Sequence, residues 1–161
     1  VQRLNSVMAE GVEVLSFRRI PEEKASNAMA LVAAADYEIR FRDASILPED
    51  LASAWESFCG QDTISVIKKT KKGERELDLK PLIYEGTCKK EPDGGDYIFL
   101  RLSAGSADNV KPELVMEAFF AFLHIVLPEF ALFIHRKELY ADTGREGKKR
   151  FVSLESLGEE F

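Results

Sequence analysis

The run from Leu102 to Glu113 constrains the fold of this chain more than any other segment. It follows an alternating apolar stretch and contains small residues, a glycine, an Asp-Asn pair and Pro112, after which an amphipathic pattern begins. A proline in the first helical turn, preceded by Asp or Asn, is typical of a helix N-terminus. The sequence therefore predicts a strand, then a short loop over residues 103–109, and then a helix that extends to about Val126.

Two more segments have clear periodicity. Tyr37, Ile39 and Phe41 alternate with charged residues, which predicts a half-buried strand. A Pro-Glu-Asp sequence ending at Asp50 precedes an apolar helical pattern that Gly60 ends, so a second long helix is expected there. Further strands are expected over residues 12–20, 63–69, 75–79, 82–90, 97–102 and 131–140, with a short helix that ends at residue 35.

This order of elements favours one fold class. Two helices interrupt a series of strands, several of which are joined by hairpin turns. Such an order is typical of an α+β, ferredoxin-like split β-α-β sandwich with an added β-hairpin, in which two helices cover one face of a mostly antiparallel sheet. We expect residues 1–34 to be the helix-strand remnant of a preceding α/β half, residues 35–141 to form the ferredoxin-like domain, and residues 142–161 to be a C-terminal extension.

Composition limits the partners. The net charge of −6 argues against a general nucleic-acid-binding protein, whose affinity comes mostly from neutralising phosphates. Residues 61–90 nevertheless hold eight basic and five acidic side chains, so a local basic patch is expected there. No apolar run approaches the roughly 20 residues of a membrane helix. Two cysteines are too few for a disulfide framework, so we expect a reduced, cytoplasmic protein without a membrane partner.

The loop at residues 103–109 is the first candidate binding site. In one interpretation its backbone N–H groups and the positive end of the following helix hold a phosphate or carboxylate, with Arg101 adding charge. In the other it is a plain connection, in which Asp108 or Asn109 caps the helix and Gly105 has a positive φ. The candidate anion-binding or RNA-binding residues of this segment are Arg101, Ser103, Gly105, Ser106 and Asn109.

A basic turn is the second candidate. Lys71, Lys72 and Arg75 surround a glycine between two expected strands, where cationic side chains can contact phosphates. The same residues would equally suit a solvated loop that discourages pairing between sheet edges.

His135 and Arg136, near the end of an expected strand, are the third candidate. A single His makes a poor metal site, and as a general acid or base it would need a carboxylate such as Asp78 or Glu138. The alternative is a hydrogen-bonded structural histidine. The chain has no CxxxCxxC, GxSxG, HExxH or GxGxxG motif, so we expect no metal or cofactor in it and identify no catalytic residue.

Four motifs in a fixed order resemble DUF2344, a radical-SAM-linked bacterial domain of unknown function. They are AMALVAAADY at 28–37, TKKG and DLKPLI at 70–73 and 78–83, LRLSAGS and NVKP at 100–106 and 109–112, and IHRKEL at 134–139. The resemblance covers about residues 1–141. It implies a domain fused to, or encoded beside, a radical-SAM protein that would carry SAM and an iron–sulfur cluster, often near a ribonuclease of the E/G type. The family also has an N-terminal part with a Gly- and Pro-rich segment, so we expect this chain to be the C-terminal part.

The resemblance and the residues together favour an accessory domain of a radical-SAM system. It would present a substrate, with RNA expected, or dock the radical-SAM partner through its sheet or its Phe-rich helix. Phe119, Phe120 and Phe122 cannot all face one core, because neighbours on a helix point about 100° apart. The alternative is a protein-protein interaction module without a nucleic-acid role. An independent enzyme would need His135, Arg136 and Asp78 to converge in one pocket.

Overall fold

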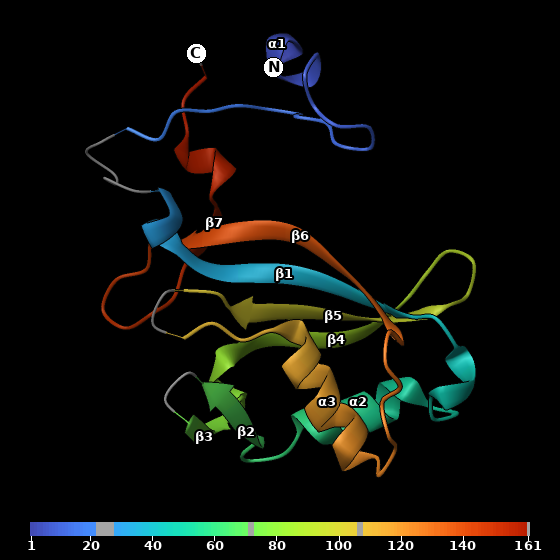
Figure 1. Ribbon diagram of the computed structural model, residues 1–161. Coiled ribbons are helices and arrows are strands. Elements are labelled where there is room, and N and C mark those ends of the chain that lie inside the picture. Colours follow the sequence, from blue (N-terminus) through green and yellow to red (C-terminus); the bar gives the residue numbers. More distant parts are fainter. Residues whose placement is uncertain (22–27, 71–72, 106–107, 161) are drawn as a thin grey trace.

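A five-stranded antiparallel sheet organises the molecule, with the strand order β4-β5-β1-β6-β7 (Figure 1). The computed structural model describes residues 1–21, 28–70, 73–105 and 108–160. The strands of this sheet are β1 (Val32–Phe41), β4 (Ile83–Lys90), β5 (Asp96–Ser103), β6 (Leu132–Asp142) and β7 (Phe151–Ser153). A separate hairpin is formed by β2 (Ser65–Thr70) and β3 (Gly73–Asp78).

The helices are short, and most of them connect one strand to the next along the chain. The α-helices are α1 (Gln2–Asn5), α2 (Leu51–Cys59) and α3 (Pro112–Phe122). The 3-10 helices are η1 (Ala28–Leu31), η2 (Ala44–Ile46), η3 (Lys80–Leu82) and η4 (Glu155–Leu157). No helix in the described ranges is long and apolar enough to cross a membrane.

The core lies between one face of the sheet and the pair α2 and α3. Ile39 of β1 lies opposite Ile98 of β5 and Ile134 of β6, so the alternate apolar residues of the three strands face the helices. The ring of Trp55 packs 5.0 Å from that of Phe119, which joins α2 to α3. Together these contacts confirm the expected α+β class, with two helices on one face of an antiparallel sheet.

Gly86 allows α2 to approach β4 closely. A Cβ atom at this position would lie 3.1 Å from Cζ2 of Trp55, which is tighter than ordinary van der Waals contact. The start of α2 is fixed by Asp50, whose Oδ1 accepts a hydrogen bond of 2.9 Å from the Ser53 N–H. The helix start and the Gly60 end expected from the sequence are therefore confirmed.

The sheet curls so that its two edges approach each other at one end. Tyr84 of β4 and Phe151 of β7 belong to opposite edge strands, yet their ring centroids are 4.9 Å apart. Nζ of Lys149 lies 4.9 Å from the Tyr84 ring and so adds a cation to this contact. The curl encloses part of the face that α2 and α3 leave uncovered.

The N-terminal and C-terminal segments lie against each other beyond β6 (Figure 1). Backbone hydrogen bonds of 3.0 and 2.9 Å join Arg19 to Glu159, and the Ser16 hydroxyl donates to the Glu155 carboxylate. The strand expected over residues 12–20 is wrong, because a single bridge at Arg19 is the only ladder contact that the described residues give this segment. Alternation without a neighbouring strand does not produce a strand.

Two other sequence expectations differ from the structure. The Ala-rich segment expected to be helical up to residue 35 instead forms η1 and then β1 from Val32 onward. Pairing on both sides of β1 outweighs the helix propensity of alanine, since tertiary context overrides propensity. The helix expected to reach Val126 ends at Phe122, because His124 adopts a left-handed conformation with φ 57°.

Candidate ligand-binding face of the sheet

The sheet face opposite α2 and α3 carries charged and aromatic side chains on four neighbouring strands. Strand alternation places them there, since their neighbours Ile39, Ile98 and Leu100 point into the core. We name this surface the open face. It comprises Glu38, Arg40 and Arg42 in and after β1, Lys89 of β4, Tyr97 and Phe99 of β5, and Phe133, His135 and Lys137 of β6.

Three aromatic rings on the open face each lie under a cation. The Lys89 Nζ is 4.0 Å from the ring centroid of Phe99, and the Arg42 Cζ is 3.9 Å from that of Phe133. Arg40 similarly lies 5.0 Å from the Tyr97 ring. Because Phe133 is 50% exposed, its ring face is accessible to a planar or cationic group from outside.

The charges of the open face favour anions. Glu38 binds Arg40 at 3.0 Å and Lys137 at 3.6 Å. Burial opposes ionisation of Glu38, but the hydrogen bond from Arg40 and the charges of Lys137, Arg40 and His135 outweigh it, so its pKa is lowered. Glu91 also binds Arg40. Among the described residues, Arg42 and Lys89 have no carboxylate partner and are available to an external anion.

A buried polar cluster borders the open face. The Arg101 Nε and Nη2 each donate a 2.7 Å hydrogen bond to the two carboxylate oxygens of Asp36, which is 5% exposed. The Tyr140 hydroxyl donates to Asp36 at 2.8 Å, and Glu85 lies 3.8 Å from the Arg101 Nη1. The Asp36 hydrogen bonds raise the pKa of Arg101, although desolvation opposes this. The cluster satisfies its own members and joins β1, β5 and β6.

Tyr140 is held protonated by this cluster. Burial raises its pKa, and the hydrogen bond that it donates to Asp36 raises it further, because both favour the neutral phenol. Its ring lies 4.5 Å from the Arg101 Cζ, which adds a cation–π contact. Tyr140 therefore acts as a hydrogen-bond donor that positions Asp36.

The predicted anion loop is closed by its own hydrogen bonds. The Ser103 hydroxyl donates to the Asp108 carbonyl at 2.6 Å, and the Val110 N–H donates to the Ser103 carbonyl at 2.9 Å. Ser103 is 6% exposed. Ser106 lies outside the described residues. Arg101 does not add charge here, because it lies on the sheet face away from α3.

Two details of the alternative interpretation, in which the loop is a plain connection, differ from the structure. Gly105 has no positive φ; it is small because a Cβ would lie 3.3 Å from the Val32 carbonyl oxygen. Neither Asp108 nor Asn109 caps α3, since the N-cap residue is Lys111 and it makes no side-chain hydrogen bond. Glu113 in the first turn already balances the helix dipole.

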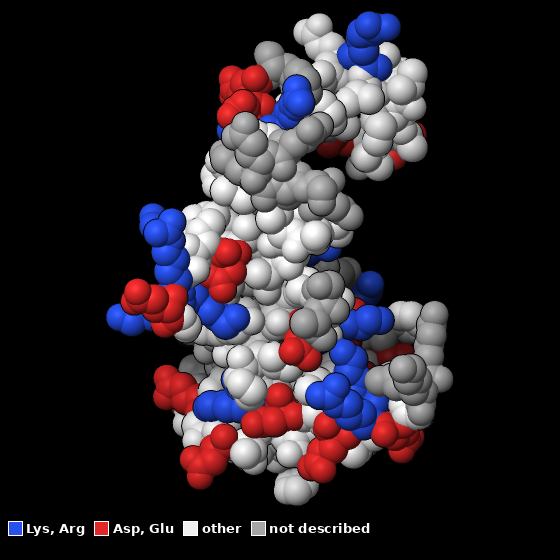
Figure 2. All heavy atoms as spheres, turned by 90° about the vertical axis from the view of Figure 1, so that its left-hand side faces the viewer, with Lys and Arg blue, Asp and Glu red and all other residues white. Residues whose placement is uncertain are grey.

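The basic hairpin and the loop do lie side by side. Nζ of Lys68 on β2 donates a 2.8 Å hydrogen bond to the Asn109 carbonyl, and Arg75 lies opposite Lys68 in the hairpin. Lys71 and Lys72 are outside the described residues. Lys68 and Lys111 share a 670 Å³ cavity with Glu113 and Glu117. Figure 2 shows the same mixture of basic and acidic side chains, with no single basic patch on this side.

His135, Arg136 and Asp78 do not converge. His135 lies on the open face, whereas Arg136 lies beside Tyr37 on the helix face. Asp78 belongs to the hairpin, where its Oδ1 accepts backbone hydrogen bonds from Ile64 at 2.8 Å and Lys80 at 3.0 Å. Within the described ranges, no group of His, Cys, Asp and Glu could hold a metal ion.

Sequence reasoning missed most of the open face. Tyr97, Phe99 and Arg101 alternate with the core residues of β5, and this period of two was the available signal. Asp36 follows three alanines of a segment that the sequence predicted to be helical, so no pattern marked it as part of a strand.

Residues 1–112 match the family described as "Uncharacterized protein conserved in bacteria (DUF2344)". No curated protein and no solved structure matches the chain. The match confirms the family named by the four motifs, without showing a radical-SAM partner. Because it spans well over half of the 161 residues, this chain belongs to the DUF2344 family.

Proposed function

We propose that this chain is an accessory domain that binds single-stranded RNA on the open face and presents it to a radical-SAM partner. The observation that carries the proposal is the set of three cation-covered rings, Tyr97, Phe99 and Phe133, on one face of the sheet. Single-stranded RNA is bound by proteins through stacking of unpaired bases on aromatic rings and through cations that follow the backbone. The radical-SAM partner rests on the resemblance.

The three rings are far enough apart for each of them to stack with a different base. Tyr97 and Phe99 are two residues apart on β5, which places them about 7 Å apart along the strand. Phe133 lies two strands away on β6, about 10 Å across the sheet. A base that stacked on Phe99 or Phe133 would displace Lys89 or Arg42 from the ring, and the released cation could then contact a phosphate.

The number of cations available on the open face sets the expected strength of RNA binding. With Arg42 and Lys89 as the cations without a carboxylate partner, about two phosphates would be neutralised, which predicts a logarithmic salt slope of about −1.4 for a single strand. Such binding is weak and confined to the open face, which is compatible with a net charge of −6.

The sheet topology supports the finer fold assignment. We infer a ferredoxin-like arrangement, because β1 and β4 run in the same direction with β5 between them and α2 in the connection. We also propose a reducing cytoplasmic location, in agreement with the free thiols of Cys59 and Cys88.

The test is a salt-dependent titration of the chain with a fluorescent oligouridylate. We expect Phe133→Ala to weaken binding about tenfold, since stacking on one ring is worth about 1–3 kcal/mol. Arg42→Gln with Lys89→Gln should weaken binding and flatten the salt slope.

The matched control removes two charges elsewhere. Arg75→Gln with Lys111→Gln lies on the hairpin and α3 side, so it should leave oligouridylate binding unchanged. Loss of binding in this control, with retention in the open-face variants, would move the RNA site to the hairpin. Absence of binding at low salt would exclude RNA presentation by this chain.

A second candidate function is docking of a protein partner at α3. Of the three Phe residues, Phe122 is 37% exposed, whereas Phe119 and Phe120 are core residues. Phe122 borders a 420 Å³ groove between α3 and β2, beside Ile67, which is 58% exposed. Recovery of the radical-SAM partner should fall for Phe122→Ser but not for Phe130→Ser, an exposed control that does not line the groove; equal recovery would exclude this groove.

A further inference from the structure

Strand β6 has an edge that is only partly paired. On the side away from β1, β7 pairs with Tyr140, Ala141 and Asp142, and the Leu154 N–H donates to the Leu139 carbonyl at 2.8 Å. After Leu154 the chain turns away from β6 into η4. In the described part of the molecule, no strand continues the ladder along residues 132–138 of β6. Unpaired strand edges are sites at which another polypeptide can add a strand.

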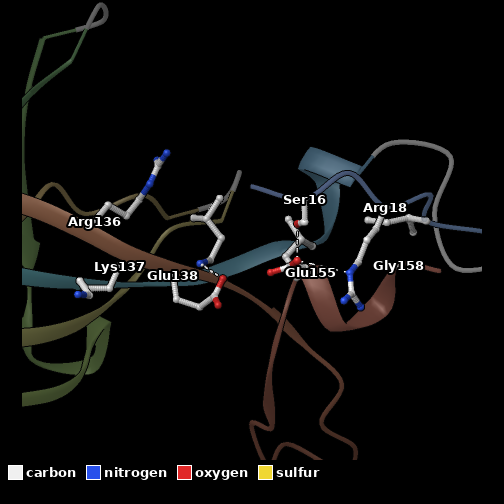
Figure 3. Close-up of a pocket in the computed structure, with 10 residues that line it drawn as sticks. Ser16, Arg18, Arg136, Lys137, Glu138, Glu155 and Gly158 are labelled. Carbon is white, nitrogen blue, oxygen red and sulfur yellow. Dashed lines mark hydrogen bonds and ion pairs between the residues drawn. The ribbon is translucent and has the colours of Figure 1, made fainter. Parts of the chain in front are cut away.

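A groove lies beside this edge (Figure 3). Its volume is 360 Å³, and one wall is β6 from Arg136 to Leu139. The other wall is formed by Ser16, Arg18 and Glu155 from the paired terminal segments. Figure 3 shows that the groove separates these two walls and that the Arg136 and Lys137 side chains leave β6 in different directions. The groove therefore continues the line of β7.

Cations outnumber carboxylates around the groove, whose lining holds Arg18, Arg136 and Lys137 but only Glu138 and Glu155. Glu138 accepts a 2.8 Å hydrogen bond from the adjacent Leu139 N–H, and Glu155 binds Ser16 and Arg18. The Glu155 charge is balanced by Arg18, whereas the neutral Leu139 N–H leaves the negative charge of Glu138 in place. Arg136, in contrast, has no ion-pair partner among the residues that the structure describes.

We infer that this groove binds an extended acidic segment of a partner protein, which adds a strand to β6 in line with β7. Backbone hydrogen bonds to residues 132–138 supply the affinity, and Arg136 supplies the preference for acidic side chains. A second copy of this chain is a poor occupant, because antiparallel pairing of β6 with itself about Arg136 would place the two Arg136 side chains opposite each other. The site adjoins the open face, because Lys137 borders both, but Arg136 lies on the helix face of β6.

The experiment uses the full chain and three synthetic ten-residue peptides. The first alternates Val or Thr with Asp or Glu, the second replaces every acid with Lys, and the third is the acidic peptide with alternate backbone nitrogens methylated. We expect the acidic peptide to bind, the Lys peptide to bind at least tenfold more weakly, and the methylated peptide not to bind, because it cannot form the ladder. In NMR spectra of the chain, the amide resonances of residues 132–138 should shift when the acidic peptide is added.

Arg136→Gln should weaken binding of the acidic peptide about fivefold. Arg75→Gln on the hairpin is the matched control, for which no effect on peptide binding is expected. Equal binding of the acidic and methylated peptides would overturn strand addition. Absence of peptide binding would overturn the whole inference. Oligouridylate binding that is lost in Arg136→Gln would assign the groove to nucleic acid instead.

Discussion

Asp36 holds a negative charge where little solvent reaches it. Its carboxylate is stabilised by two hydrogen bonds of 2.7 Å from Arg101 and one of 2.8 Å from Tyr140. A buried charge pair adds little net stability compared with apolar packing, but the loss of one member leaves the other uncompensated. Asp36 therefore fixes how β5 and β6 are aligned against β1 next to the open face.

Replacing Asp36 should show this dependence. Asp36→Ala removes the partner of Arg101, so we expect the free energy of unfolding in urea to fall by about 3 kcal/mol. The double variant Asp36→Ala with Arg101→Met should lose less than the single variant, because the charge that remains, Glu85, is 44% exposed. A single-variant loss below about 0.5 kcal/mol would show that solvent compensates Arg101.

Asp142 gives the β6–β7 turn an acid-sensitive stability. Hydrogen bonds from the N–H groups of Arg150 (2.9 Å) and Gly144 (2.8 Å) lower its pKa from the ordinary 3.8. The folded state therefore binds this proton more weakly than the unfolded state, and the stabilisation is present above pH 3.8 and lost as pH falls through the lowered pKa.

Asp142→Asn should test this effect. The variant should lose about 1 kcal/mol of unfolding free energy at neutral pH, since hydrogen bonds to a charged acceptor are stronger. The difference from the unmodified chain should shrink as pH falls below 3.8 and through the lowered pKa of Asp142. Urea unfolding measured across this pH range is the check, and a pH-independent difference would assign the effect to packing.

At the scale of elements, α3 shows how one helix divides between core and surface. Phe119 and Phe120 are buried against α2 and the sheet, whereas Phe122 reaches the groove beside β2. Spacing on the helix predicts that one of the three lies outside the core, but which one depends on where α2 packs. That contact is made by residues about 60 positions away in sequence, such as Trp55.

Alanine substitution separates the two kinds of position. Phe120→Ala should reduce the free energy of unfolding by about 3–5 kcal/mol, because it leaves a cavity in the core. Phe122→Ala should cost less than about 1.5 kcal/mol, since its ring is already 37% exposed. Thermal or urea unfolding of both variants is the measurement. Comparable losses would mean that Phe122 is a core residue.

Local signals identified individual elements better than the site. The alternation of Tyr37, Ile39 and Phe41 predicted the second half of β1, and the Pro-Glu-Asp sequence before α2 predicted the start of that helix, because both depend on nearby residues. The open face combines β1, β4, β5 and β6, so no local pattern contains it. Arg101 was selected from the sequence for the loop, but strand alternation turns it toward Asp36 instead.

The whole molecule has a packed side and a polar side. α2 and α3 enclose the core on one face, while the other face carries the cation-covered rings and the terminal segments lie beyond β6 (Figure 1). None of residues 1–21 is buried, and α1 contributes nothing to the core. Contacts of this segment with the C-terminus include two backbone hydrogen bonds, the Ser16–Glu155 hydrogen bond and exposed ion pairs, and each such ion pair is worth roughly 0–1 kcal/mol.

Removal of residues 1–21 should therefore leave the sheet folded. We expect the free energy of unfolding to change by less than about 1 kcal/mol, because the deleted segment buries no side chain. Binding of the acidic peptide should weaken, since one wall of the β6 groove is lost, while oligouridylate binding should persist. Circular dichroism with urea unfolding, followed by both titrations, is the check; collapse of the sheet would show that the segment is part of the core unit.

The central position of β1 has a consequence for how the chain behaves over time. Its backbone is bonded to β5 on one side and β6 on the other along nearly its full length, so opening its amides requires both ladders to separate. Amide protons of β1 should then exchange with deuterated water at the rate set by unfolding of the entire sheet, later than those of β7 or the hairpin. The strand whose half-buried alternation is visible in the sequence is therefore expected to have the slowest amide exchange in the molecule.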